Sequence, residues 1–311
     1  MSKEESPRYL AGDPRQIASV RRFTLADGAE AGVDALAFST GGGLDFWVLP
    51  GRLLDIATLS WRGVQVAWQS PAGFRPMPAA ITRGERDFSR AFGGFLNTCG
   101  FDHIRQPTGG KPMHGSAPHM PARLTGYGED WDAPVPILYC EGEAPIWVSG
   151  VGGYRLRRRI EAPIGGDRLR MIDRVQVVGP TPLPIMVLYH FNLGYPLHRA
   201  GTRIQLDGAD LTGPLAQQEP AVKQSVLYPV TGDRAVCRVQ GGGGIATNFS
   251  WSTVTLPWLQ LWRDLRPGCG VLSVEPCSAG RNADGTNADV PPTAPGNEIV
   301  FDIDIELADA S

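Results

Sequence analysis

The stretch Tyr154-Arg-Leu-Arg-Arg-Arg-Ile160 alternates between apolar and basic residues, the pattern of a β-strand with one buried face. The alternation resumes in Leu169-Arg-Met-Ile-Asp-Arg-Val-Gln-Val177, and Gly165-Gly166 between the two segments offers a hairpin turn. A turn centred on these glycines places apolar or oppositely charged residues face to face: Ile160 with Met171, Leu156 with Val175, Tyr154 with Val177, and Arg158 with Asp173. The sequence therefore predicts an antiparallel hairpin that carries an Arg–Asp pair on its more buried side.

Similar short apolar segments follow one another along the rest of the chain. The 39 glycines and 27 prolines among 311 residues favour many short strands joined by turns over long helices. The further segments expected to be strands are 20–25, 44–49, 52–57, 64–68, 185–192, 202–206, 225–228, 235–239, 258–262, 271–275 and 299–305. One short helix is expected within 83–95, ended by Gly93-Gly94. We predict a loose N-terminus over residues 1–12 and a single all-β domain of two packed sheets over 13–311.

Composition and charge exclude several classes of partner. Apolar residues make up 42% of the chain and charged residues 20%, which is ordinary for a globular protein with a substantial core. The formal net charge of −3 argues against nucleic acids and anionic membranes as partners, and the row Arg155, Arg157 and Arg159 is expected to be a solvated face. The N-terminus has no apolar signal region, and no segment is long enough to span a bilayer. Five widely spaced cysteines without a C-x-x-C motif are expected to be reduced thiols in a cytoplasmic protein.

The segment Ile185-Met-Val-Leu-Tyr-His-Phe-Asn-Leu-Gly-Tyr-Pro196 carries a histidine in the middle of an apolar strand. Alternation places His190 and Asn192 on one face and Tyr189 and Phe191 on the other. A rigid strand of this kind could hold a general acid in place, but His190 could equally be a core histidine bonded to a carbonyl oxygen. His114 and His119 share one loop, so a metal site formed with His190 and Glu275 is a further alternative.

Three stretches read together resemble the catalytic segments of the galactose mutarotase (aldose 1-epimerase) superfamily. They are Pro112-Met-His-Gly115, Leu188-Tyr-His-Phe-Asn-Leu193 and Leu272-Ser-Val-Glu-Pro276. The less characterised bacterial aldose-epimerase-like branch is similar in further stretches: Arg52-Leu-Leu-Asp-Ile, Arg62-Gly-Val, Trp68-Gln-Ser-Pro, Gly93-Gly-Phe-Leu-Asn-Thr-Cys-Gly100 and Asn192-Leu-Gly-Tyr-Pro196. Two details depart from the superfamily pattern. His190 adjoins Phe191 directly, without two intervening residues, and Ser116 stands in place of a second glycine after His114.

The resemblance implies a β-supersandwich of two large, mainly antiparallel sheets and an enzyme that interconverts sugar anomers without a metal or cofactor. In this interpretation Glu275 removes the proton of the C1 hydroxyl and His190 protonates the ring oxygen, so that the ring opens. His114 would donate a hydrogen bond to the oxygen where charge develops. We expect the three side chains to line one concave pocket, with His190 and Glu275 on opposite sides of a sugar-sized gap.

The resemblance also suggests the residues that would bind the sugar. These are Arg90, Asn97, Asn192 and Trp262, with Trp68 and Trp258 as further aromatic candidates. The partner would be a small-molecule sugar. Two alternatives remain open at this stage: a non-catalytic carbohydrate-binding or regulatory protein on the same fold, and a metal-dependent sugar isomerase. The identity of the sugar, the acidic residue that grips its hydroxyls and the oligomeric state do not follow from the sequence.

Overall fold

The computed structural model describes residues 7–75, 85–241 and 244–310. Within these ranges most residues lie in strands, and the two α-helices are short: α1 (Pro7–Leu10) and α2 (Glu85–Ala91). The described residues also form four 3-10 helices: η2 (Pro14–Gln16), η3 (Gly28–Glu30), η4 (Pro50–Arg52) and η5 (Ala117–His119). The part of the expected helix that is described, α2, ends before Gly93 and Gly94, which have φ angles of +156° and +104°. Among the described helices, none has the length and apolar character that crossing a bilayer requires.

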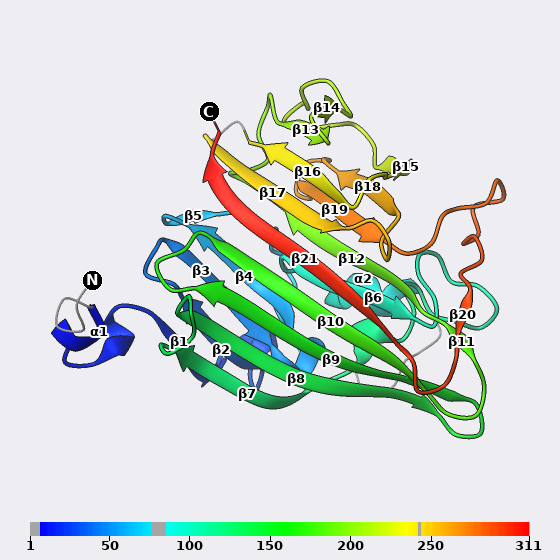
Figure 1. Ribbon diagram of the computed structural model, residues 1–311. Helices are drawn as coiled ribbons and strands as arrows, with labels where there is room; N and C mark the ends of the chain where they lie inside the picture. Colours follow the sequence, from blue (N-terminus) through cyan, green and yellow to red (C-terminus); the bar gives the residue numbers. More distant parts are fainter. Residues whose placement is uncertain (1–6, 76–84, 242–243, 311) are drawn as a thin grey trace.

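A large antiparallel sheet forms one layer of the molecule (Figure 1). Over the described residues its strand order is β14 (Ala209–Asp210), β13 (Arg203–Leu206), β16 (Arg234–Gln240), β17 (Ile245–Ser252), β21 (Glu298–Asp309), β10 (Arg168–Val178), β9 (Gly152–Pro163), β8 (Ile137–Val148) and β7 (Arg123–Asp130). The predicted hairpin is its β9–β10 pair, and the register is confirmed, with Ile160 opposite Met171 and Arg158 opposite Asp173. The strands end at Pro163 and resume at Arg168, so the connection is longer than two residues but stays centred on the predicted glycines.

Two smaller sheets form the opposite layer. One, in the part of the chain that is described, contains β1 (Ser19–Thr24), β2 (Asp34–Ser39), β3 (Leu44–Leu49), β4 (Asp55–Trp61) and β5 (Val64–Gln65). The other has the order β15 (Lys223–Pro229), β18 (Trp258–Asp264), β19 (Val271–Cys277), β12 (Met186–Leu193) and β6 (Leu96–Phe101). A β-bridge between Ala67 and Leu193 joins the two, and a short pair, β11 (Leu183–Pro184) with β20 (Pro292–Thr293), lies beside them. The predicted all-β supersandwich is therefore confirmed.

One continuous apolar core fills the space between the layers. It combines Phe301 from the large sheet, Phe38 and Phe46 from the first small sheet, and Tyr189 and Phe191 from the second. Burial of such large side chains is the main term that stabilises the sandwich. A shared core supports one domain over 13–311, which stays a prediction, as does the loose N-terminus, because residues 1–6 lie outside the described ranges. All five cysteines are free thiols, as expected.

Several strand predictions need correction. The segment 52–57 begins as η4 with Leu53 and Leu54 in left-handed conformations, so β4 starts only at Asp55. The segment 64–68 is paired as a strand only over β5. Of the described strands with six or more residues, β2, β6, β7, β8 and β17 were not predicted. In β7, Gly126 and Gly128 interrupt the apolar alternation on which prediction depends.

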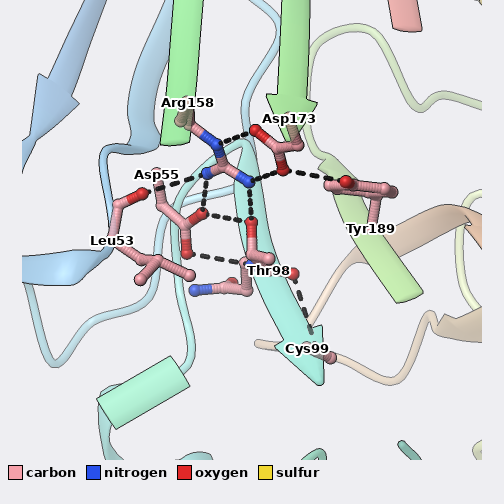
Figure 2. A network of polar contacts seen from close by, with 8 residues as sticks. Leu53, Asp55, Thr98, Cys99, Arg158, Asp173 and Tyr189 are labelled. Carbon is pink, nitrogen blue, oxygen red and sulfur yellow. Dashed lines mark hydrogen bonds and ion pairs between the residues drawn. The ribbon is translucent and has the colours of Figure 1, made fainter. Parts of the chain in front are cut away.

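The core also encloses a charged network centred on Arg158 (Figure 2). The Arg158 guanidinium donates to both Asp173 carboxylate oxygens, at 2.7 and 2.6 Å, and to Asp55 at 2.9 Å. Its two remaining N–H groups donate to the Leu53 carbonyl and the Thr98 hydroxyl. The left-handed turn before β4 thus supplies a carbonyl to this cation, and the first residue of β4 supplies a carboxylate. Arg158 and Asp173 side chains have no exposed area, which confirms the predicted buried pair.

Candidate active site

A cavity of about 650 Å³ lies on the side of β12 that faces away from the core. Helix α2, the loop after β6, and strands β12, β15, β18 and β19 all contribute to its wall. Phe88, Phe92 and Trp262 form the apolar part of the lining, while His114, His190 and Glu275 bring polar groups into the same space. The structure thus brings together three side chains that come from distant parts of the sequence.

His190 reaches the cavity because β12 alternates. Tyr189 and Phe191 enter the core, so His190 is turned to the other face. Its Nδ1 lies 2.6 Å from Asn192 Oδ1. The Asn192 amide nitrogen donates to the Gly94 carbonyl at 3.0 Å, which fixes Oδ1 as the atom that faces His190. Nδ1 must therefore carry a hydrogen, and Nε2 is the ring nitrogen available for proton exchange.

Glu275 on β19 lies next to this nitrogen, and its Oε1 is 3.3 Å from His190 Nε2. Apart from that contact Oε1 has no hydrogen-bond partner among the described residues. The other oxygen, Oε2, accepts a short hydrogen bond from Gln260 Nε2. Gln260 is held in this orientation because its Oε1 accepts from Arg105 Nε at 2.8 Å and from Arg281 Nη2 at 2.6 Å. A proton on the Glu275 carboxyl group therefore belongs on Oε1, facing His190.

Burial shifts both members of the pair toward their uncharged forms. It lowers the pKa of His190 to about 4, although the hydrogen bond that Nδ1 donates to Asn192 Oδ1 opposes this shift. It raises the pKa of Glu275 to about 8, against the opposing effects of Gln260 and the Arg105 and Arg281 charges. Between these values the pair holds one proton, and that proton resides on the carboxyl side. Two such groups titrate as a pair with two macroscopic pKa values.

His114 is held by its own backbone in the loop after β6. Its N–H donates to the Arg105 carbonyl at 2.8 Å, its carbonyl accepts from Gly100, and its φ is +61°. The next residue has to be glycine, because a Cβ on Gly115 would stand 2.2 Å from the His103 carbonyl oxygen. The ring centroid lies 4.5 Å from that of Phe88 and 5.6 Å from that of His190. Burial holds the pKa of His114 well below its usual range, so the ring is neutral and donates from one nitrogen only.

The expected gap between His190 and Glu275 is wrong, because the two groups are in direct contact at 3.3 Å. They adjoin because β12 and β19 are neighbouring strands. The arrangement still suits ring opening, since the C1 hydroxyl oxygen and the ring oxygen are bonded to the same carbon. An acid and a base that lie side by side can therefore reach both oxygens.

The residues expected to bind the sugar occupy different places. Trp262 lines the cavity, its ring centroid 5.8 Å from that of His190. Arg90 is exposed and does not line the cavity, because Phe88 of α2 and Phe92, the residue after the helix, take the positions that face the cavity. Asn192 and Asn97 lie behind His190 and bond to each other at 3.1 Å. They are placed to position the histidine, and neither of them lines the cavity.

The two further tryptophan candidates, Trp68 and Trp258, also lie outside the cavity lining. Trp68 donates from its indole nitrogen to the Cys269 carbonyl at 2.7 Å, and Trp258 packs in the small core around Leu188. His119 is buried in η5 and does not line the cavity. Within the described ranges no group of three or more His, Cys, Asp and Glu side chains is arranged to hold a metal ion.

Several polar residues of the site were not identified from the sequence. They include Gln260, Arg105, Arg281 and Lys223. Arg105 and Arg281 lie in loops with no recognisable motif, and only the fold brings them beside Glu275. Gln260 could have been found from register, because it faces Glu275 across β18 and β19. Finding it would have required a prediction that segments 258–262 and 271–275 pair in this register.

Comparisons with known proteins agree with this architecture. The family described as "Domain of unknown function (DUF4432)" matches residues 30–233. Among solved structures, a "putative aldose 1-epimerase" from Klebsiella pneumoniae has a TM-score of 0.79 at 17% identity, covering 94% of this chain and 84% of its own. A galactose mutarotase-like protein from Clostridium acetobutylicum has a TM-score of 0.65 at 11% identity, covering 93% and 98%. Such low identities show the fold alone. No curated protein matches at a significant level.

Proposed function

We propose that this chain, which belongs to the DUF4432 family, catalyses the interconversion of the α and β anomers of a sugar. The observation that carries the proposal is the 3.3 Å contact between His190 Nε2 and Glu275 Oε1, two buried groups in the wall of a cavity. Mutarotation needs a group that removes a proton and a group that supplies one, at two oxygens of the same carbon. The names of the structural neighbours in the mutarotase fold support the same reaction.

The reaction would begin when the C1 hydroxyl loses its proton to the base of the pair. The electrons of that O–H bond form the C1 carbonyl double bond as the bond between C1 and the ring oxygen breaks. The acid of the pair protonates the departing ring oxygen, so protons and electrons balance without a co-reactant. Rotation about C1–C2 presents the other face of the aldehyde, and the two groups reverse their roles to close the ring. In this proposal the proton on Glu275 Oε1 first passes to His190 Nε2 across their 3.3 Å contact. Glu275 is then the base and His190 the acid for opening.

The remaining residues of the site would bind and orient the sugar. The neutral ring of His114 can donate one hydrogen bond to an oxygen of the reacting centre. Its buried Nδ1 has no hydrogen-bond partner among the described residues, so a ligand could satisfy it. Trp262 and Phe92 offer flat apolar surfaces to the C–H face of a sugar ring. Asn192 fixes the tautomer of His190, and Gln260 fixes the orientation of Glu275.

The direct test is the rate of anomer equilibration with purified protein. Freshly dissolved α-anomers of several aldoses, with their uronic acids and 6-phosphates, would be followed by polarimetry and by NMR of the anomeric protons. We expect at least one of these sugars to equilibrate faster in proportion to enzyme concentration. If none is accelerated although one binds, the protein is a carbohydrate-binding protein on this fold and the proposal fails.

A further inference from the structure

The cavity contains more positive than negative side chains. Arg105, Arg281 and Lys223 line it, and Glu275 is the one acidic residue of the lining that the structure describes. None of the three cations lies within 4.0 Å of a carboxylate in the described ranges. The arginines of the large sheet are different, since Arg157, Arg170 and others there pair with Glu or Asp across neighbouring strands. The cavity thus has an excess of positive charge that no ion pair among the described residues neutralises.

The two arginines differ in what they have left to donate. Arg105 is buried and uses all five N–H groups on neutral acceptors: the Gln260 and Asn287 side chains, the Gly280 and Ala279 carbonyls, and Cys277 Sγ. Arg281 is half-buried and donates from Nη1 to the Ser225 carbonyl, and from Nη2 to Ser225 Oγ and Gln260. A guanidinium has five donors. Two N–H groups of Arg281 therefore have no partner among the described residues, and this side chain can bind a ligand.

Strand β15 is shaped to bring further donors to the same place. Its pairing with β18 shifts register between Lys223 and Val226, which marks a β-bulge. As a result the consecutive residues Lys223, Gln224 and Ser225 all line the cavity, whereas a regular strand would turn every second one away. The Lys223 side chain is exposed and has no ion-pair partner in the described structure. Arg281 bonds to Ser225 directly, so the bulge and the arginine form one basic end of the cavity.

We propose that the sugar bound by this site carries an anionic group, a carboxylate or a phosphate, which binds at Arg281 and Lys223. The anomeric carbon would then lie at His190 and Glu275. This inference rests on the proposed function for the identity of the reacting carbon. The fold alone does not imply an anionic group on the sugar. The inference depends on the unpaired cations, because a neutral sugar does not require them. An oxyanion would satisfy the free N–H groups of Arg281 with charge-assisted hydrogen bonds, which are the stronger kind.

The test compares binding of neutral and anionic sugars to the whole protein by isothermal titration calorimetry. The probes are glucose, glucuronic acid and glucose 6-phosphate, with the galactose and mannose counterparts. We expect at least one anionic sugar to bind about tenfold or more tightly than its neutral parent, the factor that a single hydrogen bond to a charged group provides. Whether the uronic acids or the 6-phosphates benefit identifies the anion. The preference should weaken as salt increases.

Two variants and one control locate the anion. Lys223→Gln and Arg281→Gln should each lower the ratio of anionic to neutral affinity, by about tenfold for the arginine. The Lys223 side chain is exposed and makes no hydrogen bond or ion pair with the described residues, so its variant remains informative if Arg281→Gln disturbs Gln260. Arg155→Gln removes one charge from the exposed face of the large sheet, outside the cavity, and should leave the ratio unchanged.

The outcomes separate this inference from the proposed function. Equal affinities for neutral and anionic sugars would overturn the inference, whether or not any sugar is turned over. A preference for anionic sugars that survives in both cavity variants would overturn it as well. Tight binding of an anionic sugar that is lost in Lys223→Gln, without any acceleration of anomer equilibration, would support the anion site and reject the mutarotase reaction.

Discussion

Two buried polar clusters lie back to back across the same pair of strands. Tyr189 on β12 and Thr98 on β6 turn inward to the Arg158 network, whereas their neighbours His190 and Asn97 turn toward the cavity side. In the first cluster every N–H of Arg158 has a partner, and two carboxylates surround the cation. In the second, the buried atoms Glu275 Oε1 and His114 Nδ1 have no hydrogen-bond partner in the described structure.

The difference shows how burial can serve stability in one place and chemistry in another. A buried charge is tolerated when its partners satisfy it, and burial then strengthens each contact. Burial alone would lower the pKa of Arg158, but Asp173 and Asp55 outweigh it and raise that pKa, so the guanidinium stays charged. At the cavity nothing compensates Glu275 to the same extent, and its pKa rises to about 8. Unsatisfied groups are costly in a folded protein, and they are expected where a ligand completes them.

The largest effect is expected from Glu275→Gln. The substitution keeps the size of the side chain but removes the group that exchanges a proton with His190. We expect kcat for anomer equilibration to fall by about 10²–10⁴-fold, the usual contribution of a general base. The melting temperature should hardly change or should rise, because a buried carboxyl group with a raised pKa favours unfolding as the pH increases from about 4.5 to 8. A variant that retains near-normal kcat would remove Glu275 from the mechanism.

Asp173→Asn, which breaks the Arg158 network, is expected to lower stability and to leave catalysis largely unchanged. Asp173 accepts from two nitrogens of Arg158 and from the Tyr189 hydroxyl at 2.8 Å. Removing its charge leaves a buried cation with Asp55 alone, so the free energy of unfolding should fall by about 3–5 kcal/mol. Glu143→Gln is the matched control, because it removes one partner of an exposed cross-strand pair with Arg123 and should cost at most about 1 kcal/mol.

Urea unfolding of both variants, with the wild type alongside, measures this contrast. Equal free energies of unfolding for Asp173→Asn and the wild type would mean that the buried network does not stabilise the fold. Asp173→Asn protein that remains folded should keep most of its kcat, because Asp173 does not line the cavity.

A smaller effect is expected from pH: kcat/KM should fall by about tenfold per pH unit outside the range in which the pair holds one proton. The pair needs one proton: with two protons there is no base, and with none there is no acid. Because burial lowers the pKa of His190 to about 4 and raises that of Glu275 to about 8, kcat/KM should be bell-shaped with limbs near these values. After subtraction of the uncatalysed rate, a limb at the ordinary histidine pKa of about 6.5 would show that His190 titrates as an exposed residue.

The two clusters were not equally accessible to prediction. The Arg158–Asp173 pair follows from the sequence because two alternating segments and one glycine turn fix the register of the hairpin. Asp55 and Thr98 could not be added to it, since they enter through a left-handed turn and a non-local contact that leave no periodic pattern. Local alternation predicts which residues of a strand face the same side, and it does not predict which other segments that side meets.

The candidate site was predicted in its centre and missed at its edge. His114, His190 and Glu275 stand in motifs that resemble a known family, so their order along the chain was informative. The same resemblance predicts Arg90, but Phe88 of α2 and the adjoining Phe92 face the cavity and leave Arg90 exposed. Arg105 and Arg281 lie in irregular loops, where neither alternation nor helical periodicity exists to indicate a facing direction.

The smallest and most specific effect is expected from Asn192, which holds His190 without lining the cavity. Asn192→Ala removes the acceptor of the Nδ1 hydrogen bond, which at present opposes the lowering of the His190 pKa. The acid limb of the pH profile should therefore move to lower pH. Asn192→Asp keeps an acceptor and adds a negative charge, so it should raise the His190 pKa and move the limb to higher pH.

Both substitutions remove the donor that bonds to the Gly94 carbonyl and Asn97, which makes them a matched pair. Each should lower kcat/KM at its optimum by about tenfold or less, the contribution of one ordinary hydrogen bond. Loss of packing alone would reduce activity in both variants and leave the limb where it is. Displacement of the limb in opposite directions requires that residue 192 acts through the charge of His190. If the two limbs coincide with that of the wild type, the acid limb belongs to another group and His190 is not the acid of the pair.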